Sequence, residues 1–148
     1  CCAHCNYGKV DMLPSTFITN AVNVANFNDD DLKEKPVIST FVDANDKSRY
    51  ARCSGGSYAE YRWHAGKRKR TFELSKIEFA TLQAGDCAYC GRSAFFNGGK
   101  NGVDQVLPDG GYVTANVVSC CSICNHNKKR QSVADFLARC KRVRDLQK

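Results

Sequence analysis

The stretches Cys87-Ala88-Tyr89-Cys90-Gly91 and Cys120-Cys121-Ser122-Ile123-Cys124-Asn125 decide the fold of this chain. Each contains a Cys-x-x-Cys pair, and about thirty residues separate the two pairs. Two such pairs predict a tetrahedral zinc site held by four thiolates, those of Cys87, Cys90, Cys121 and Cys124. A disulfide scaffold is the alternative for a chain with ten cysteines, but this spacing suits a metal better. Bound thiolates also imply a reducing compartment such as the cytosol, the nucleus or an organelle matrix.

The segment between the two pairs predicts a β-hairpin. Residues 103–107 read as its first strand, the Pro-Asp-Gly-Gly sequence at 108–111 as its turn, and residues 113–119 as its second strand. A short helix is expected to begin near Cys121 and to carry Asn125 and Lys128.

Capping residues predict two further helices around this hairpin. Ser75 and Glu78 form a capping box for a helix that ends at Gly85, and Ser132 and Asp135 form another. The first helix shows part of an apolar face at Ile77, Ala80 and Leu82. The second has the clearest helical spacing in the chain, with apolar side chains at Val133, Phe136, Leu137, Cys140, Val143 and Leu146. A basic helix over 58–70 and a short strand over 37–42 are also expected.

The order of these pieces resembles the HNH endonuclease family, in its zinc-stapled phage and restriction-type branch. The resemblance covers roughly residues 61–137 and includes Asn101-Gly102-Val103-Asp104, the stretch 111–118 and both cysteine pairs. It implies an α+β fold, a small zinc-stapled ββα-metal module with flanking helices and a cysteine-containing N-terminal extension. We expect residues 1–57 to form that extension and residues 58–148 the HNH-like domain with its basic lead-in and C-terminal amphipathic helix.

The resemblance also implies roles for individual residues. Asp104 and Asn125 would hold a divalent ion, Mg²⁺, and Asn116 would tie the hairpin loop by side-chain bonds to the backbone. Gln105 stands where the family often has the histidine that acts as general base. Because glutamine cannot accept a proton near neutral pH, the resemblance predicts a catalytically impaired site. His64 and His126 are nearby substitutes for the base, although His126 is expected to face away from its neighbour Asn125.

A second zinc knuckle is predicted near the N-terminus. Cys2 and Cys5 form a Cys-x-x-Cys pair, and Cys53 offers a third sulfur. Cys1 or His4 could complete the ligand set.

Positive charge is concentrated in two segments. The net charge is +7, and residues 49–76 and 128–148 each hold eight basic and two acidic residues. Such segments with interleaved aromatic side chains predict contact with a polyanion. The residues expected to bind nucleic acid are Arg62, Trp63, Lys67, Arg68, Lys69, Arg70, Lys128, Lys129 and Arg130.

Three functions are compatible with these features. The first is a basic, zinc-bound module on RNA or DNA, for instance with other proteins in a large ribonucleoprotein such as an organellar ribosome. The second is an active metal-dependent HNH endonuclease, and the third is a zinc-stapled protein–protein adaptor, which leaves the charge unexplained. No apolar run is long enough to cross a bilayer, so no membrane partner is expected. Because the sequence starts with Cys1 rather than methionine, we expect it to be a processed product or a recombinant fragment.

Overall fold

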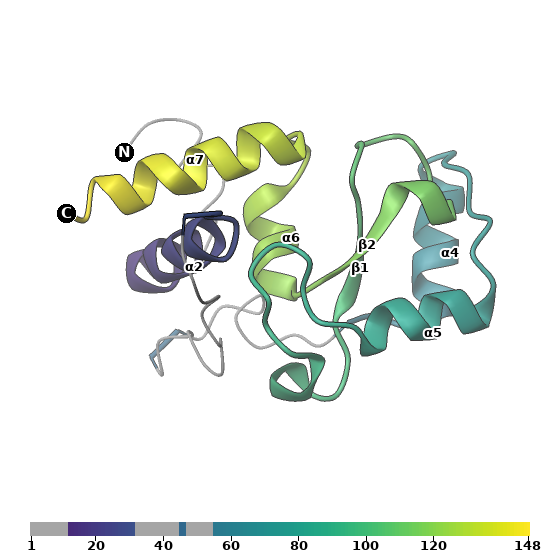
Figure 1. Cartoon of the computed structure of the whole chain (residues 1–148). Coiled ribbons are helices and arrows are strands. Elements are labelled where there is room, and N and C mark those ends of the chain that lie inside the picture. Colours follow the sequence, from purple (N-terminus) through teal and green to yellow (C-terminus); the bar gives the residue numbers. More distant parts are fainter. Residues whose placement is uncertain (1–11, 32–44, 47–54) are drawn as a thin grey trace.

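The computed structural model describes residues 12–31, 45–46 and 55–148. A two-stranded hairpin and a short helix lie in the middle, with one helix pair on either side (Figure 1). In chain order, the described elements are α2 (Pro14–Phe27), α4 (Tyr58–Lys67), α5 (Lys76–Ala84), the 3-10 helix η1 (Ala94–Asn97), β1 (Gly102–Gln105), the 3-10 helix η2 (Thr114–Asn116), β2 (Val117–Cys120), α6 (Ser122–Lys128) and α7 (Val133–Asp145).

The central hairpin is followed directly by a helix, which gives the expected ββα order. β1 and β2 are antiparallel, with Gly102 opposite Cys120 and Gln105 opposite Val117. Both strands are shorter than the sequence predicted. The second strand begins only at Val117, because residues 114–116 form η2. Gly111 has φ of 77°, and a Cβ there would lie 3.0 Å from the backbone oxygen of Thr71. The turn therefore requires glycine at this position.

Serine caps begin three of the described α-helices, and two of these caps were predicted. The side chains of Ser75 and Ser132 accept hydrogen bonds from the backbone N–H groups of Glu78 and Asp135, as expected. Ser57 and Glu60 form a second capping box, which begins α4, whereas Ser132 caps α7 by its side chain alone and not as the predicted box. The predicted basic helix over 58–70 is therefore present, but it ends at Lys67.

The helix pair α4 and α5 covers the hairpin through an aromatic cluster. Phe79 on α5 is buried and meets the rings of Tyr58 and Tyr61 edge-on, with centroids 5.5 and 5.0 Å apart. The apolar face predicted for α5 was partly wrong. Ile77 is 79% exposed, and α5 instead buries Phe79 and Gln83.

The other helix pair, α2 and α7, packs at the opposite end of the molecule (Figure 1). The two helices share one hydrophobic cluster with α6 and the four cysteines of the Cys-x-x-Cys pairs. Phe136 and Cys140 on α7 are buried as the helical spacing predicted, whereas Leu146 lies past the end of the helix and is 82% exposed. α2 was not predicted as a helix, although it belongs to the expected N-terminal extension. The domain boundary at residue 57 stays a prediction, as does a strand over 37–42, which lies outside the described residues.

Candidate functional site

Four buried cysteines come together between the hairpin, α6 and the loop before β1. The sulfur atoms of Cys87, Cys90, Cys121 and Cys124 all lie within 4.8 Å of one another. Those of Cys90 and Cys121 are 3.9 Å apart, and none of the cysteines in the described ranges forms a disulfide. Four sulfurs at about 2.3 Å from one zinc ion are about 3.8 Å from each other in a tetrahedron. The cluster therefore fits a single structural zinc ion.

Burial acts against ionisation of most of these thiols. Burial raises the pKa of the Cys124 thiol and of the neighbouring Cys120 thiol. Although burial opposes it, hydrogen bonds from surrounding thiols lower the pKa of Cys87. Four thiolates at this spacing repel one another, so a dication is needed to hold all of them ionised.

A polar chain links the cysteine cluster to α2 and α7, and sequence reasoning missed it. The side-chain amide of Asn20 on α2 donates to the sulfur of Cys124 at 3.2 Å. Its oxygen accepts from Asn127 at 2.7 Å, and Arg139 on α7 donates to the side chain and backbone oxygens of Asn127 at 2.6 Å. All three residues are buried in an apolar surrounding. The apolar spacing of α2 and α7 could have predicted these helices from the sequence. No sequence pattern, however, pairs an asparagine with a cysteine about a hundred residues away.

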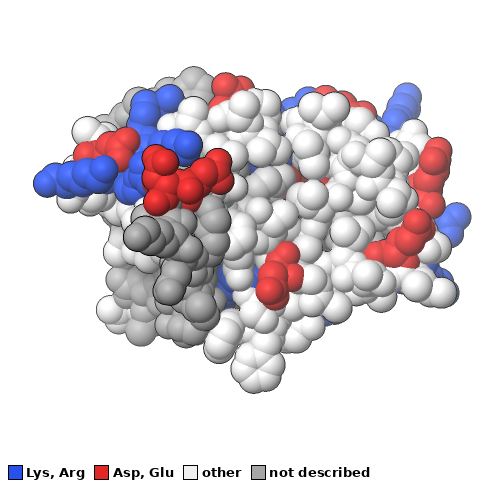
Figure 2. Space-filling view, in the orientation of Figure 1, with Lys and Arg blue, Asp and Glu red and all other residues white. Residues whose placement is uncertain are grey.

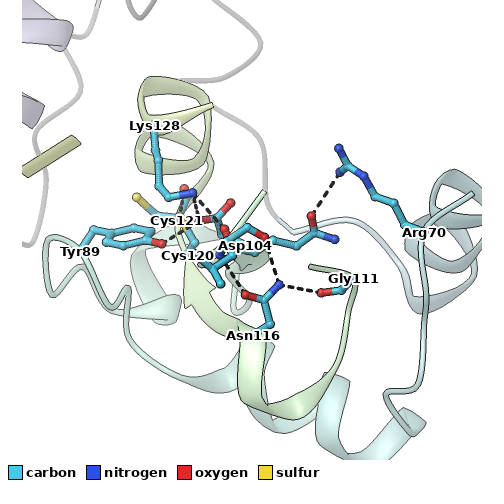
Figure 3. Close-up of polar contacts among 10 residues, drawn as sticks. Arg70, Tyr89, Asp104, Gly111, Asn116, Cys120, Cys121 and Lys128 are labelled. Carbon is cyan, nitrogen blue, oxygen red and sulfur yellow. Dashed lines mark hydrogen bonds and ion pairs between the residues drawn. The ribbon is translucent and has the colours of Figure 1, made fainter. Parts of the chain in front are cut away.

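The hairpin loop is held by Asn116. Its side chain accepts from the backbone N–H of Leu107 at 2.9 Å and donates to the carbonyl oxygens of Leu107 and Gly111 at 3.1 and 3.0 Å (Figure 3). A Cβ on Gly110 would lie 2.6 Å from this amide, so the loop closes tightly around it. This is the geometry that the family resemblance implied for Asn116.

Asp104 on β1 is paired with a buried lysine (Figure 3). The Lys128 ammonium lies 2.9 Å from Oδ2 of Asp104 and also donates to the backbone oxygen of Gln105 at 2.9 Å. The Tyr89 hydroxyl donates to the same carboxylate oxygen at 2.7 Å. Burial raises the pKa of Asp104, although Lys128 and Tyr89 favour its ionised form. Burial and the neighbouring carboxylate raise the pKa of Tyr89, which therefore remains a donor.

This pairing does not fit the divalent ion that the resemblance implied. Mg²⁺ requires close octahedral coordination by oxygen atoms, and one oxygen of Asp104 already accepts two hydrogen bonds. The Lys128 ammonium also places a positive charge beside that carboxylate. Asn125 is half-buried near the same place and offers only a neutral amide. The residues, as arranged, favour an internal ion pair over a bound dication.

Gln105 is buried at the end of β1 and has an unused donor. Its Oε1 accepts from Arg70 at 3.2 Å, and its Nε2 has no hydrogen-bond partner among the described residues. Because a guanidinium group only donates, this contact fixes which end of the amide faces Arg70. Arg70 and Arg130 both pair with Asp109, at 2.7 and 2.6 Å.

These residues line one groove between α4, the hairpin and α6, with a volume of about 970 Å³. We call it the hairpin groove. Its acidic residues are engaged within the chain, since Glu60 caps α4, Asp104 pairs with Lys128 and Asp109 pairs with two arginines. The lining residues that bear on function are Asp104, Gln105, Asn125, His64, His126, Arg68, Arg70, Lys129 and Arg130. The groove thus contains both histidines considered as substitutes for a base.

The predicted nucleic-acid-binding residues are unequally available. Lys128 is fully buried, so its expected contact with phosphate is not possible in this conformation. Two more basic residues of the C-terminal segment are engaged within the chain and are not open to a ligand. Arg139 is buried, and Arg144 pairs with Asp29 at 2.5 Å. By contrast, Arg62, Trp63, Lys67, Arg68 and Lys69 are exposed. The face in Figure 2 carries its basic side chains mainly at two edges and few at its centre.

The predicted second zinc site and the membrane expectation have different outcomes. Cys2, Cys5 and Cys53 of the predicted second zinc site lie outside the described residues. None of the described helices has the length and apolarity needed to span a membrane.

The chain is similar in sequence to a mimivirus protein. The chain is 32% identical over 139 residues to a protein of Acanthamoeba polyphaga mimivirus called uncharacterized protein R423. The match covers 94% of this chain but only 24% of that protein, so the chain spans about a quarter of the length of its relative. No protein-family model and no solved structure matches the chain.

Proposed function

We propose that this chain is a nucleic-acid-binding module built on an HNH-type scaffold and that the hairpin groove holds the phosphate backbone. One observation carries the proposal. The Gln105 amide is buried in the groove with an unused N–H donor, beside guanidinium groups. A buried donor without a partner costs about 1 to 3 kcal/mol. The Nε2 atom is covered in the free chain, so a ligand in the groove gains that energy when the Gln105 side chain turns to meet it. A phosphate oxygen is such an acceptor, and the cations that line the groove suit its charge.

Impaired catalysis is part of the proposal. Gln105 cannot take a proton from water, and Lys128 holds the carboxylate that the resemblance assigns to a divalent ion. The four-cysteine cluster would hold structural zinc, and Cys2, Cys5 and Cys53 would contribute to a second zinc site. The bound thiolates would place the protein in a reducing compartment.

A charge substitution at Gln105 tests the proposal. Gln105→Glu removes the donor and adds a negative charge, so we expect about 10-fold to 100-fold weaker binding of RNA or DNA, as for the loss of a hydrogen bond to a charged group. Gln147→Glu makes the same charge change at an exposed site outside the groove lining and should leave affinity within about two-fold of wild type. Equal affinities of the two variants, or affinity independent of salt concentration, would contradict phosphate binding in the groove.

A second candidate, an active HNH endonuclease, is favoured by one observation: His64 and His126 both line the hairpin groove. A nicking assay on plasmid DNA and structured RNA, with Mg²⁺ and with Mn²⁺, separates the two functions. Binding without cleavage supports the module. Metal-dependent cleavage that Asp104→Ala abolishes would support the endonuclease instead.

A further inference from the structure

A second hollow lies on the other side of α4 and contains the one tryptophan of the chain. Its volume is about 720 Å³. Its described lining includes three basic side chains, those of Arg62, Lys67 and Lys76, and no acidic one. We call it the Trp63 hollow. Apart from α4 itself, it shares no element with the hairpin groove, because Lys76 comes from the start of α5.

The ring of Trp63 is exposed to solvent, and two neighbouring side chains contact it. The side chain is 59% exposed, which is unusual for so large an apolar group. The ammonium of Lys67 lies 5.1 Å from the ring centroid, and the ring of His64 meets it edge-on at 4.7 Å. A ring held by its neighbours loses little freedom when a flat ligand stacks on it.

Gly66 is a glycine that the described part of the chain does not itself require. Glycine in a helix is unfavourable by up to about 1 kcal/mol relative to alanine, the full value applying to the helix interior. Its backbone does not need glycine, since φ is not positive at Gly66. A Cβ there would also meet no atom within 4 Å, so no close packing within the described chain requires its absence. The missing side chain keeps the surface beside Trp63 open.

We propose that the Trp63 hollow is a stacking subsite for an unpaired base of a single-stranded nucleic acid. The ring provides the stacking surface, and Arg62, Lys67 and Lys76 contact the flanking phosphates. A duplex does not fit this role, because its bases are already stacked and only a single strand can place one on the ring. A strand that crosses α4 reaches both the hollow and the hairpin groove. The subsite therefore rests on the proposed function and adds a preference for single strands to it.

Intrinsic fluorescence tests the subsite directly, because Trp63 is the only tryptophan. The full chain is titrated with oligonucleotides of about twelve nucleotides, as single-stranded RNA, single-stranded DNA and a hairpin duplex. We expect the single strands to quench the emission and the duplex to change it little. Similar quenching by both single strands assigns the base as the ligand, and quenching by RNA alone assigns a contact that includes the 2′-hydroxyl.

Variants separate stacking from general charge. Trp63→Ala should weaken single-strand binding about 10-fold, the typical loss of one stacked base, and Trp63→Phe should restore most of it. Gly66→Leu, which improves helix propensity and has room in the free chain, should raise the melting temperature and still weaken binding several-fold. Phe95→Ala removes another exposed ring, on η1, and should leave affinity unchanged.

The possible results distinguish this inference from the proposed function. If single strands bind in a manner that depends on Gln105 while Trp63 emission and the affinity of Trp63→Ala stay unchanged, the subsite is refuted and the groove remains. Tighter binding of the duplex than of the single strand also refutes the subsite. Absence of binding by any oligonucleotide refutes both.

Discussion

Replacement of Asn20 by alanine tests how α2 is attached to the cysteine cluster. Asn20 is fully buried, donates to the sulfur of Cys124 at 3.2 Å and accepts from Asn127 at 2.7 Å. The substitution removes both hydrogen bonds and leaves the Asn127 amide with a buried donor that has lost this acceptor. A buried group left without its partner costs about 1 to 3 kcal/mol, and we expect a loss of stability in that range.

The contact with Cys124 adds an effect on the metal. An amide N–H that donates to sulfur stabilises the thiolate over the thiol, and such outer contacts typically change metal affinity 10-fold to 100-fold. Asn20→Ala should therefore weaken zinc binding about 10-fold or more. Competition with a chromogenic chelator measures this affinity, and urea unfolding measures the loss of stability.

The matched control is Asn23→Ala, on the same helix at a half-buried position. Both variants change helix propensity equally, so the difference between them isolates the buried contacts. Zinc affinity should differ between them by the same factor as between Asn20→Ala and wild type. If Asn20→Ala unfolds more easily but binds zinc as tightly as Asn23→Ala, Asn20 is a core amide with no influence on the metal, and the reasoning is refuted.

Three further outcomes follow from the structure. Lys128→Met should destabilise the fold by about 3 to 5 kcal/mol in urea unfolding, because it leaves Asp104 as an uncompensated buried charge; a double variant with Asp104→Leu that recovers no stability would contradict this pairing. Arg144 lowers the pKa of Asp29 from its ordinary value of 3.8, so the stability from this pair is present above pH 3.8 and lost as pH falls below it. Circular dichroism of Asp29→Asn should show that its stability depends less on pH below 3.8 than that of wild type. The same loss of stability in acid for both proteins would refute the role of this pair. Asn116→Ala should cost about 1 to 3 kcal/mol through the lost loop bonds, and an unchanged unfolding midpoint would contradict that role.

Local signals in the sequence predicted the hairpin, the cysteine cluster and the helices α5 and α7. The caps at Ser75 and Ser132 and the Cys-x-x-Cys pairs act over a few residues, so their pattern specifies both the element and its position. The wrong details concern which side of an element is buried. Ile77 has suitable helical spacing but is exposed, because the hairpin lies against Phe79. Helical spacing alone does not say which neighbour a helix meets.

Contacts between distant segments could not be predicted in the same way. The helix α2 has no strong cap, and its burial depends on α7, more than a hundred residues later. The same limit applies to Lys128, which the sequence placed on a basic surface because its neighbours are Lys129 and Arg130. The structure turns its side chain inward to Asp104, since α6 packs against β1. Charge counts along a chain do not separate exposed cations from internal ones.

The buried pair of Lys128 and Asp104 bears on both parts of the proposed function, which are phosphate binding and impaired catalysis. An unpaired Asp104 would add negative charge to the hairpin groove and would attract a dication, whereas the paired one does neither. In the proposed function, the same lysine would disfavour metal-dependent hydrolysis and would preserve the positive character of the groove for a phosphate backbone. Phosphate binding through Gln105 then requires no divalent ion as a bridge. Affinity for a single strand should therefore be the same with and without added Mg²⁺ at equal ionic strength, and a strong increase with Mg²⁺ would show that Asp104 is available to the ion after all.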